Sequence, residues 1–274
     1  MNRIKAEVYL EGLGNDITSP FFDHLNALHF ILQDSGEICK LDHSAQMKPV
    51  SRTGGQPADA TFGSNKMMYV TDFAHGAVLA IQGEQQEEIV TVYEDKPLKG
   101  PNSIAIDSSG TIYFSDSGPL GETGLHNSTG SLFMINNSAA GQILKPISLE
   151  NLAYPSGIAL SPSGRILYVT EMMTNRILRF FQKPDGVFHG SVFYQNTGGV
   201  GPSCITVDKD GKIYIGIYDI KEATSDGTVL VLDKIGKLIN TIITKGPEVS
   251  GLIILKNTLY ITEKTTGSIQ QVDI

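Results

Sequence analysis

The sequence predicts an all-β fold, a six-bladed β-propeller of four-stranded antiparallel blades, and three observations support this prediction. A unit of about 46 residues recurs six times along the 274 residues, and each unit contains about four short strands. A spare strand near the N-terminus also matches a strand that the last unit lacks. Units of about 40 to 50 residues with four strands each are typical of propeller blades. We therefore expect residues 1–274 to form one domain.

Each unit opens with an apolar strand, a tight polar turn and a second strand that carries a ring side chain. The clearest copies are PNSIAIDSSGTIYFSD from Pro101, PSGIALSPSGRILYVTE from Pro155 and PSCITVDKDGKIYIG from Pro202, with fainter copies from Thr18, Pro57 and Val249. The ring residues of the second strands are His29, Tyr69, Tyr113, Tyr168, Tyr214 and Tyr260. The turns DSSG, SPSG and DKDG hold residues that favour tight hairpins. DKDG also resembles the start of a calcium loop, but the later ligands of such a loop are missing, which favours a turn.

The last unit lacks an outer strand, because only three strands fit between Val249 and Ile274. Residues Ile4 to Leu10 precede the first unit and have no other place in the pattern. We expect this N-terminal strand to complete the last blade and so remove an exposed sheet edge, which would otherwise invite aggregation.

Composition excludes several classes of protein. With 41% hydrophobic and 18% charged residues the chain is predicted to bury a large core. The net charge of −8, without a long basic block, argues against nucleic acid as a partner. No apolar run approaches the roughly 20 residues of a membrane span, so we expect no membrane insertion. The start of the chain lacks a signal-peptide pattern, and Cys39 and Cys204 are the only cysteines, so we expect a cytoplasmic protein.

In a propeller the first residues of the innermost strand and the last residues of the second strand lie at the same rim of the central channel. Function is expected at this rim. Aligning the six units gives an inner set of Thr18, Ala58, Asn102, Ser156, Ser203 and Val249 or Ser250. The second strands end at Leu32, Asp72, Asp116, Glu171, Ile217 and Glu263. The inner set is mostly hydroxyl and amide, whereas the outer set is largely acidic.

Two segments carry a resemblance to a known family, namely GPNSIAIDSSGTIYFSDS and YPSGIALSPSGRILYVTEMMTNRILRF. The chain resembles the senescence marker protein, gluconolactonase and luciferin-regenerating enzyme family, and its six-bladed relatives, the strictosidine synthase-like proteins. The second segment looks especially like the strictosidine synthase-like branch. The resemblance implies a six-bladed propeller, which agrees with the count of units.

The resemblance also implies functional positions, most of which are changed in this chain. In the lactonase-like members a divalent metal, usually calcium, is held by a Glu, two Asn and an Asp, and the matching positions are Thr18, Asn102, Ser156 and Ser203. Only Asn102 is retained. Because calcium gains affinity from carboxylate charge, we expect no resident metal and at most weak Ca²⁺ binding. In the synthase-like branch a glutamate of the last blade acts as a base. The matching position is Ser250, which does not support that chemistry, and Glu248 two residues earlier would substitute only if the loop were shifted.

The acidic rim residues Asp72, Asp116, Glu171 and Glu263 leave two interpretations open. Carboxylates that converge raise one another's pKa and yield a general base or a cation site. Alternatively, each accepts hydrogen bonds from backbone N–H groups of its own loop. The loop of residues 118–129 is the longest surplus in any unit and carries His126, a possible acid or base. We take Asp116, Glu171 and His126 as catalytic candidates, and Asp72 and Glu263 with the inner hydroxyl and amide residues as ligand-binding candidates.

The leading hypothesis is a propeller that has lost the metal-dependent hydrolase centre and binds a small polar ligand or a protein partner. The motivating observation is the replacement of three of four metal positions. The alternative is an active lactone or ester hydrolase, or a metal-free synthase-like enzyme, with its site around Asn102.

Overall fold

The computed structural model describes residues 3–42, 44–138, 141–197, 201–219 and 225–274, and in these ranges the protein is all-β apart from a single 3-10 turn, η1 (Met172–Thr174). Six sheets, each with four antiparallel strands, form the blades of a six-bladed β-propeller, and the fifth sheet carries an additional parallel strand. This architecture confirms the predicted fold class. None of the described segments is a helix that is long and apolar enough to cross a membrane. By internal contacts the chain divides into two compact units, Phe21–Pro155 and the remainder, Met1–Pro20 with Ser156–Ile274.

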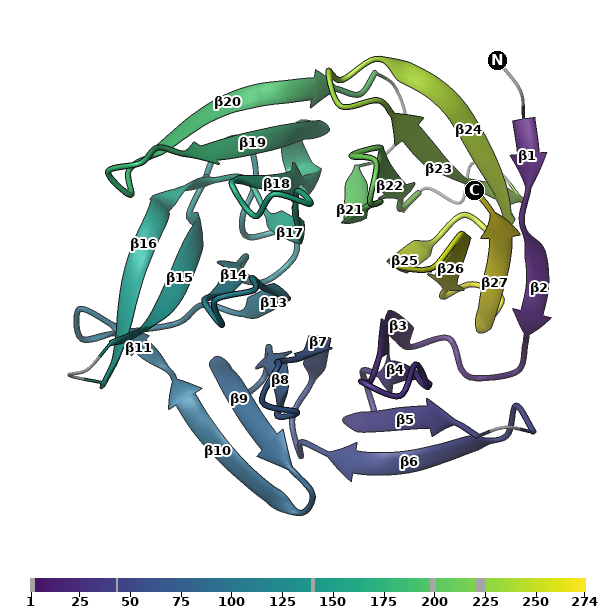
Figure 1. Cartoon of the computed structure of the whole chain (residues 1–274), viewed down its shortest axis with the longest axis horizontal. Coiled ribbons are helices and arrows are strands. Elements are labelled where there is room, and N and C mark those ends of the chain that lie inside the picture. The colour runs from purple at the N-terminus through teal and green to yellow at the C-terminus, as the bar shows by residue number, and fades with distance from the viewer. Residues whose placement is uncertain (1–2, 43, 139–140, 198–200, 220–224) are drawn as a thin grey trace. The chain divides into compact units, whose positions relative to one another are not determined.

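The unit of Phe21–Pro155 holds three sheets, in which each strand pairs with the next one along the chain (Figure 1). The first sheet is β3 (Ile17–Phe22, whose first residues belong to the other unit), β4 (Leu28–Leu32), β5 (Glu37–Leu41) and β6 (Met47–Arg52). The second is β7 (Pro57–Phe62), β8 (Met68–Asp72), β9 (Ala77–Gln82) and β10 (Gln85–Val90). The third is β13 (Pro101–Ile106), β14 (Ile112–Asp116), β15 (Gly130–Ser138) and β16 (Gly141–Leu152). A small hairpin, β11 (Val92–Tyr93) and β12 (Lys96–Pro97), precedes the third sheet.

The other unit holds the remaining three sheets. The fourth is β17 (Pro155–Leu160), β18 (Ile166–Glu171), β19 (Arg176–Gln182) and β20 (Phe188–Gln195). The fifth is β21 (Pro202–Val207), β22 (Ile213–Ile217), β23 (Asp226–Leu232) and β24 (Leu238–Lys245), extended by β1 (Arg3–Lys5). The sixth is β25 (Val249–Leu255), β26 (Thr258–Glu263), β27 (Ser268–Asp273) and β2 (Glu7–Leu10).

The N-terminal segment joins two sheets of its unit (Figure 1). β2 pairs antiparallel with β27, as predicted for a strand that completes the last blade. The prediction was wrong for the first residues of this segment, because Ile4 pairs with Ile242 in a parallel ladder between β1 and β24. Ala6 lies between the two strands and donates its backbone N–H to the carbonyl of Ile243, 2.9 Å away. The segment therefore covers the outer edges of both the fifth and the sixth sheet.

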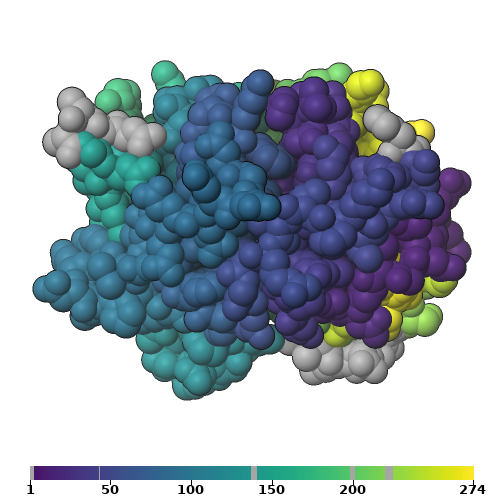
Figure 2. All heavy atoms as spheres, turned by 90° about the horizontal axis from the view of Figure 1, so that it is seen from below, coloured from purple at the N-terminus to yellow at the C-terminus, as the bar shows by residue number. Residues whose placement is uncertain are grey.

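The hydrophobic core lies between neighbouring sheets. In the unit of Phe21–Pro155, Phe21 and Ile31 of the first sheet pack against Val70 and Leu79 of the second. Outer strands are far more exposed, as in β6 and β10, whose residues fall in the blue part of the surface in Figure 2. This gradient arises because the faces between sheets exclude water, whereas the outermost edges of the sheets do not.

The ring residues lie on the second strand of every sheet, as predicted. Two of them also hold the hairpin turn before them, because Tyr113 Oη donates to Asp107 Oδ2 at 3.2 Å and Tyr214 Oη donates to Asp208 Oδ2 at 3.3 Å. Asp208 Oδ1 accepts the backbone N–H groups of Asp210 and Lys212, so DKDG forms a turn closed by its own aspartate. Burial raises the pKa of Tyr113 to about 12, so its hydroxyl remains a donor at neutral pH.

Innermost strands of neighbouring sheets approach closely where a glycine follows the first serine of the strand. A Cβ at Gly157 would lie 2.8 Å from Cys204 Cα and 3.1 Å from Ile205 N, both in the backbone of β21. A Cβ at Gly251 would lie 2.8 Å from the backbone nitrogen of Ser19 and 2.3 Å from Pro20 Cδ in the proline ring. Because backbone atoms do not yield as a flexible side chain does, these contacts require glycine.

Gly157→Ala is expected to lower the free energy of unfolding by about 2 kcal/mol, because the added methyl group overlaps the backbone of the neighbouring strand. Urea denaturation of the purified protein measures this value. Gly190→Ala is the matched control, since the added Cβ there meets only the Phe180 ring at 3.0 Å on an exposed strand. Equal losses in the two variants would contradict the close approach at Gly157.

Candidate functional site

The structure places the predicted rim residues at equivalent points of all six sheets. Each inner residue is the second residue of the first strand of its sheet, which also selects Ser250 over Val249. Each outer residue is the last residue of the second strand of its sheet. In the sheets that begin at β7, β13, β21 and β25, the inner residue lies at a register shift between these two strands. Such bulges redirect side chains. In β21 and β25 the inner residues Ser203 and Ser250 contact the innermost strand of the neighbouring sheet.

The inner hydroxyls of one unit donate hydrogen bonds to the innermost strand of the next sheet. Ser156 Oγ donates to Pro202 O at 3.1 Å, and Ser203 Oγ donates to Val249 O at 2.6 Å. Thr18 Oγ1 donates to Ser250 O at 3.0 Å, and Ser250 Oγ donates back to Ile17 O at 2.8 Å. We call these hydroxyl-to-carbonyl contacts between neighbouring sheets seam bonds. Each provides a hydrogen-bond partner for a backbone carbonyl near the start of an innermost strand.

Asn102 is the inner residue of the third sheet and belongs to a different polar cluster. Its Nδ2 lies 3.2 Å from Ser117 Oγ and 3.4 Å from Tyr154 Oη. Its backbone carbonyl accepts a seam bond from Thr71 Oγ1 at 2.7 Å. Asn102 and Tyr154 are partly exposed, whereas Ser117 is buried. The cluster is therefore an uncharged amide, hydroxyl and phenol group with one open side.

Tyr154 was missed by the sequence analysis. Its φ of +58° lies in the left-handed region, which is costly for a bulky residue and is typical of functional positions. This backbone conformation directs the phenol toward Asn102, and burial raises its pKa, so the phenol stays neutral. The signal in the sequence is weak, since only its position before Pro155 marks it as a residue outside regular structure.

The outer carboxylates are buried and organise loops. Asp72 Oδ1 accepts the backbone N–H groups of Gln56 and His75, each at 3.0 Å. Asp116 accepts those of Lys99 and Gly100, the latter at 2.7 Å.

Glu263 accepts the backbone N–H groups of Glu248, Thr265 and Thr266 at 2.7–3.0 Å. Glu171 Oε2 accepts from the Thr174 hydroxyl and the Arg176 guanidinium. Asp72, Asp116 and Glu263 thus follow the loop-binding interpretation. In the described ranges no three His, Cys, Asp or Glu side chains converge as a metal-binding group.

Asp72 also faces His75, whose Nδ1 lies 3.1 Å from Asp72 Oδ1. Within the described residues, Asp72 Oδ2 is the buried side-chain oxygen without a hydrogen-bond partner. Gly55 packs against this pair, because a Cβ there would lie 2.3 Å from Asp72 Oδ1. His75 is not among the site residues predicted from the sequence.

His126 lies in an ordered loop at the protein surface. Isolated bridges join Leu120 to Thr123 and Gly124 to Asn127, and Asn127 Nδ2 donates to Glu122 O at 2.9 Å. His126 itself is exposed, as is Leu125 beside it. The structure thus places His126 on a compact loop but gives it no carboxylate partner among the described contacts.

A family model supports the resemblance that the sequence motifs indicate. The model of the SMP-30/gluconolactonase/LRE-like region matches residues 18–265. The chain belongs to this family. It covers nearly the whole propeller pattern, from the inner residue Thr18 to the loop after Glu263.

Curated relatives in the family are named as lactonases. Lactonase drp35 of Staphylococcus haemolyticus is 31% identical over 185 residues, which is 65% of this chain and 52% of that protein. Lactonase drp35 of Staphylococcus aureus (strain USA300) is 27% identical over 252 residues, covering 88% of this chain and 72% of that protein. The chain thus spans about half the length of the first of these relatives.

Solved structures of family members share the fold. A gluconolactonase from Xanthomonas campestris gives a TM-score of 0.80 at 17% identity, covering 98% of this chain and 94% of that chain. The calcium-binding protein regucalcin from Agrobacterium tumefaciens gives 0.80 at 18% identity, covering 99% and 94%. These likenesses establish the fold and not the activity.

Asp116 gives a prediction on pH dependence. Burial raises its folded-state pKa above the ordinary value of 3.8, although backbone N–H groups of Lys99 and Gly100 oppose the shift. A raised acid pKa stabilises the folded state below the unfolded value and loses that contribution as pH rises through the folded value. The unfolding free energy of the wild type minus that of Asp116→Asn is therefore expected to fall as pH rises above 3.8. Urea denaturation over a pH series measures it, and a constant or rising difference would refute the assignment.

Proposed function

We propose that this chain is a binding member of the family, in which the metal-dependent hydrolase centre has been lost. The observation that supports the proposal is the set of seam bonds made by Thr18, Ser156 and Ser203. These hydroxyls hold positions at which the family resemblance implies metal ligands, and they donate their protons to backbone carbonyls of neighbouring strands.

The donor set does not fit calcium. Calcium takes 6 to 8 oxygen ligands and gains affinity from carboxylate charge. Thr18 and Ser203 replace the two carboxylates that the resemblance implies, so the four matched positions carry no formal charge. A metal at these positions would also have to displace the seam bonds. For these reasons the proposal includes no step through a metal ion.

The proposed ligand is small and polar, and it contacts the amide of Asn102 and the phenol of Tyr154. Both groups are neutral and partly exposed, and both exchange hydrogen bonds without a change of charge. A protein partner is the other form of binding that the proposal allows. A cytoplasmic location is part of the proposal.

A second candidate function is lactone or ester hydrolysis, or metal-free synthase-like chemistry. The names of the curated relatives and the retained Asn102 favour it. In this candidate, Asp116, Glu171 or His126 would supply general acid or base catalysis beside Asn102. The buried contacts of Asp116 and Glu171 count against such a role, because both carboxylates are already bound within their loops.

The proposal predicts that calcium does not stabilise the wild-type protein. Thermal unfolding is measured with CaCl₂ up to about 10 mM, above the Kd of weak calcium modules. A resident site would add roughly 2.7 kcal/mol at 100 times its Kd. The comparison variant is the triple substitution Thr18→Glu, Ser156→Asn and Ser203→Asp, which restores the family pattern and is expected to gain a calcium-dependent shift.

Hydrolysis gives a second, independent readout on the wild type alone. No calcium- or zinc-dependent hydrolysis of a sugar lactone or an aryl ester is expected. Metal-dependent turnover that Asn102→Ala abolishes would overturn the proposal. Metal-independent turnover lost in Asn102→Ala would instead support the second candidate.

A further inference from the structure

A trough of about 730 Å³ lies on one face of the fifth sheet, near its outer edge, and is open to solvent. Its floor crosses three neighbouring strands, β23, β24 and β1 (Figure 1). All three belong to one compact unit, Met1–Pro20 with Ser156–Ile274. Because small-molecule sites typically have about 300 to 1,000 Å³, the trough has room for a ligand the size of a phosphorylated sugar.

The strand register gathers polar side chains on this floor. Arg3 lies opposite Thr241, and Lys5 lies opposite Ile243, in the parallel ladder of β1 with β24. Thr228 lies opposite Ile243 in the antiparallel ladder of β23 with β24. Alternate residues of a strand share a face, and laterally paired residues point to the same side of the sheet. These five side chains therefore project from one face, and all of them line the trough.

The cations of the trough have no internal counter-ion. Arg3 and Lys5 are exposed, and neither forms an ion pair with a described residue. The hydroxyls of Thr228 and Thr241 are half-buried and form no hydrogen bond within the described ranges. A step of two residues along a strand separates the Cα atoms of Arg3 and Lys5 by about 6.6 Å. Two cations at this spacing, with hydroxyl donors beside them, suit a dianion with several acceptor oxygens, as in a phosphate monoester.

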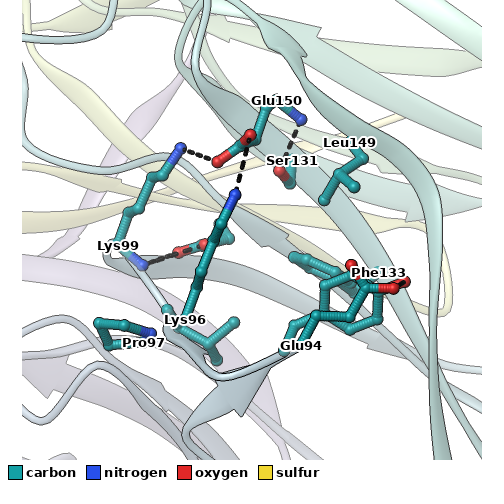
Figure 3. A pocket seen from close by; sticks show the side chains of 11 residues that line it. Glu94, Lys96, Pro97, Lys99, Ser131, Phe133, Leu149 and Glu150 are labelled. Carbon is teal, nitrogen blue, oxygen red and sulfur yellow. Dashed lines mark hydrogen bonds and ion pairs between the residues drawn. The ribbon is translucent and has the colours of Figure 1, made fainter.

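The cleft beside the β11–β12 hairpin has the opposite arrangement (Figure 3). Its volume is only about 40 Å³, which is too little for a small-molecule site. Lys99 Nζ lies 2.9 Å from Glu150 Oε1, and Lys96 Nζ lies 3.8 Å from Glu150 Oε2. The lysines of this cleft are thus neutralised within the protein, whereas Arg3 and Lys5 of the trough are available to a ligand.

Asp226 is the one carboxylate among the described residues that line the trough, so the lining has a net charge of +1. It pairs laterally with Lys245 and lies two strands away from Lys5. The strand spacings place its Cα about 12 Å from that of Lys5. This distance exceeds the Debye length of about 8 Å at physiological ionic strength, so repulsion of an anion at β1 is largely screened. A carboxylate in this place accepts hydrogen bonds from hydroxyl groups at the far end of a ligand.

We propose that the trough binds a small phosphate monoester with a hydroxylated body, such as a sugar phosphate. The phosphate lies between Arg3 and Lys5, beside the hydroxyl of Thr241. The body crosses Ile243, and its far hydroxyl groups donate to Asp226. The inference does not depend on the proposed function, since the trough shares no residue with the rim positions.

Calorimetric titration with glucose 6-phosphate tests the proposal, with glucose as the uncharged body and inorganic phosphate as the charged group alone. The wild type is expected to bind glucose 6-phosphate more tightly than inorganic phosphate and not to bind glucose. Arg3→Gln and Lys5→Gln are each expected to weaken binding of glucose 6-phosphate about fivefold, because one charged partner is lost. Asp226→Asn is expected to narrow the difference between glucose 6-phosphate and inorganic phosphate, because a neutral amide is a weaker acceptor than a carboxylate.

Lys183→Gln, at an exposed lysine in a turn of the fourth sheet, is the matched control and is expected to leave binding unchanged. An equal effect of Lys183→Gln and Lys5→Gln would overturn the proposal. So would the absence of glucose 6-phosphate binding in the wild type, or equal affinities for glucose 6-phosphate and inorganic phosphate.

A lipid headgroup is the other source of a phosphate monoester. Sedimentation with vesicles of phosphatidylcholine and phosphatidic acid distinguishes the two sources. The protein is expected to stay in the supernatant. Sedimentation with these vesicles, lost in Lys5→Gln and without binding of glucose 6-phosphate, would overturn the proposal of a small soluble ligand.

Discussion

The close approach of innermost strands from neighbouring sheets is the constraint on which the rest of this structure depends. Near its start the first strand bulges, and a small side chain beside the bulge donates to the carbonyl of the next sheet. Glycine then allows the backbones to touch, as at Gly157. A hydroxyl suits this role because it is short and has one proton to donate. The same hydroxyl is a poor substitute for a carboxylate that holds a cation, so packing and metal chemistry make opposite demands on these positions.

Carboxylates remain abundant one step away, at the ends of the second strands. There Asp72, Asp116 and Glu263 accept backbone N–H groups of adjacent loops. The acidic residues and the neutral hydroxyls thus satisfy complementary backbone groups, N–H at the loops and C=O at the seams. Most polar residues near the rim are therefore explained by backbone hydrogen bonding alone. The side chains of Asn102 and Tyr154 differ, because they bond to each other, bind no backbone group in these contacts and are partly exposed.

The sequence predicted the fold well because a hairpin with a ring residue repeats in all six units. The inner and outer positions followed from the same alignment and match the observed strand starts and ends. Local backbone geometry escaped prediction. Tyr154 and Glu150 adopt left-handed backbone conformations although neither is a glycine, so the residue type does not indicate them. The parallel pairing of β1 with β24 involves only three residues of β1, and their partners are more than 230 residues away in the sequence. The β11–β12 hairpin was missed because it lies outside the repeat that the alignment followed.

The pairing of the N-terminal segment affects the order in which the fifth and sixth sheets form during synthesis. β2 and β1 leave the ribosome before every sheet, yet their partners β27 and β24 are among the last strands translated. The fifth and sixth sheets therefore gain their outer strands only after nearly the whole chain has emerged. Until then β1 and β2 are unpaired strands on a nascent chain, which is the kind of exposed segment that chaperones recognise. Completion of these two sheets is thus a late event in biosynthesis, governed by strand pairings of more than 230 residues in sequence separation, such as Arg3 with Thr241 and Glu7 with Gln271.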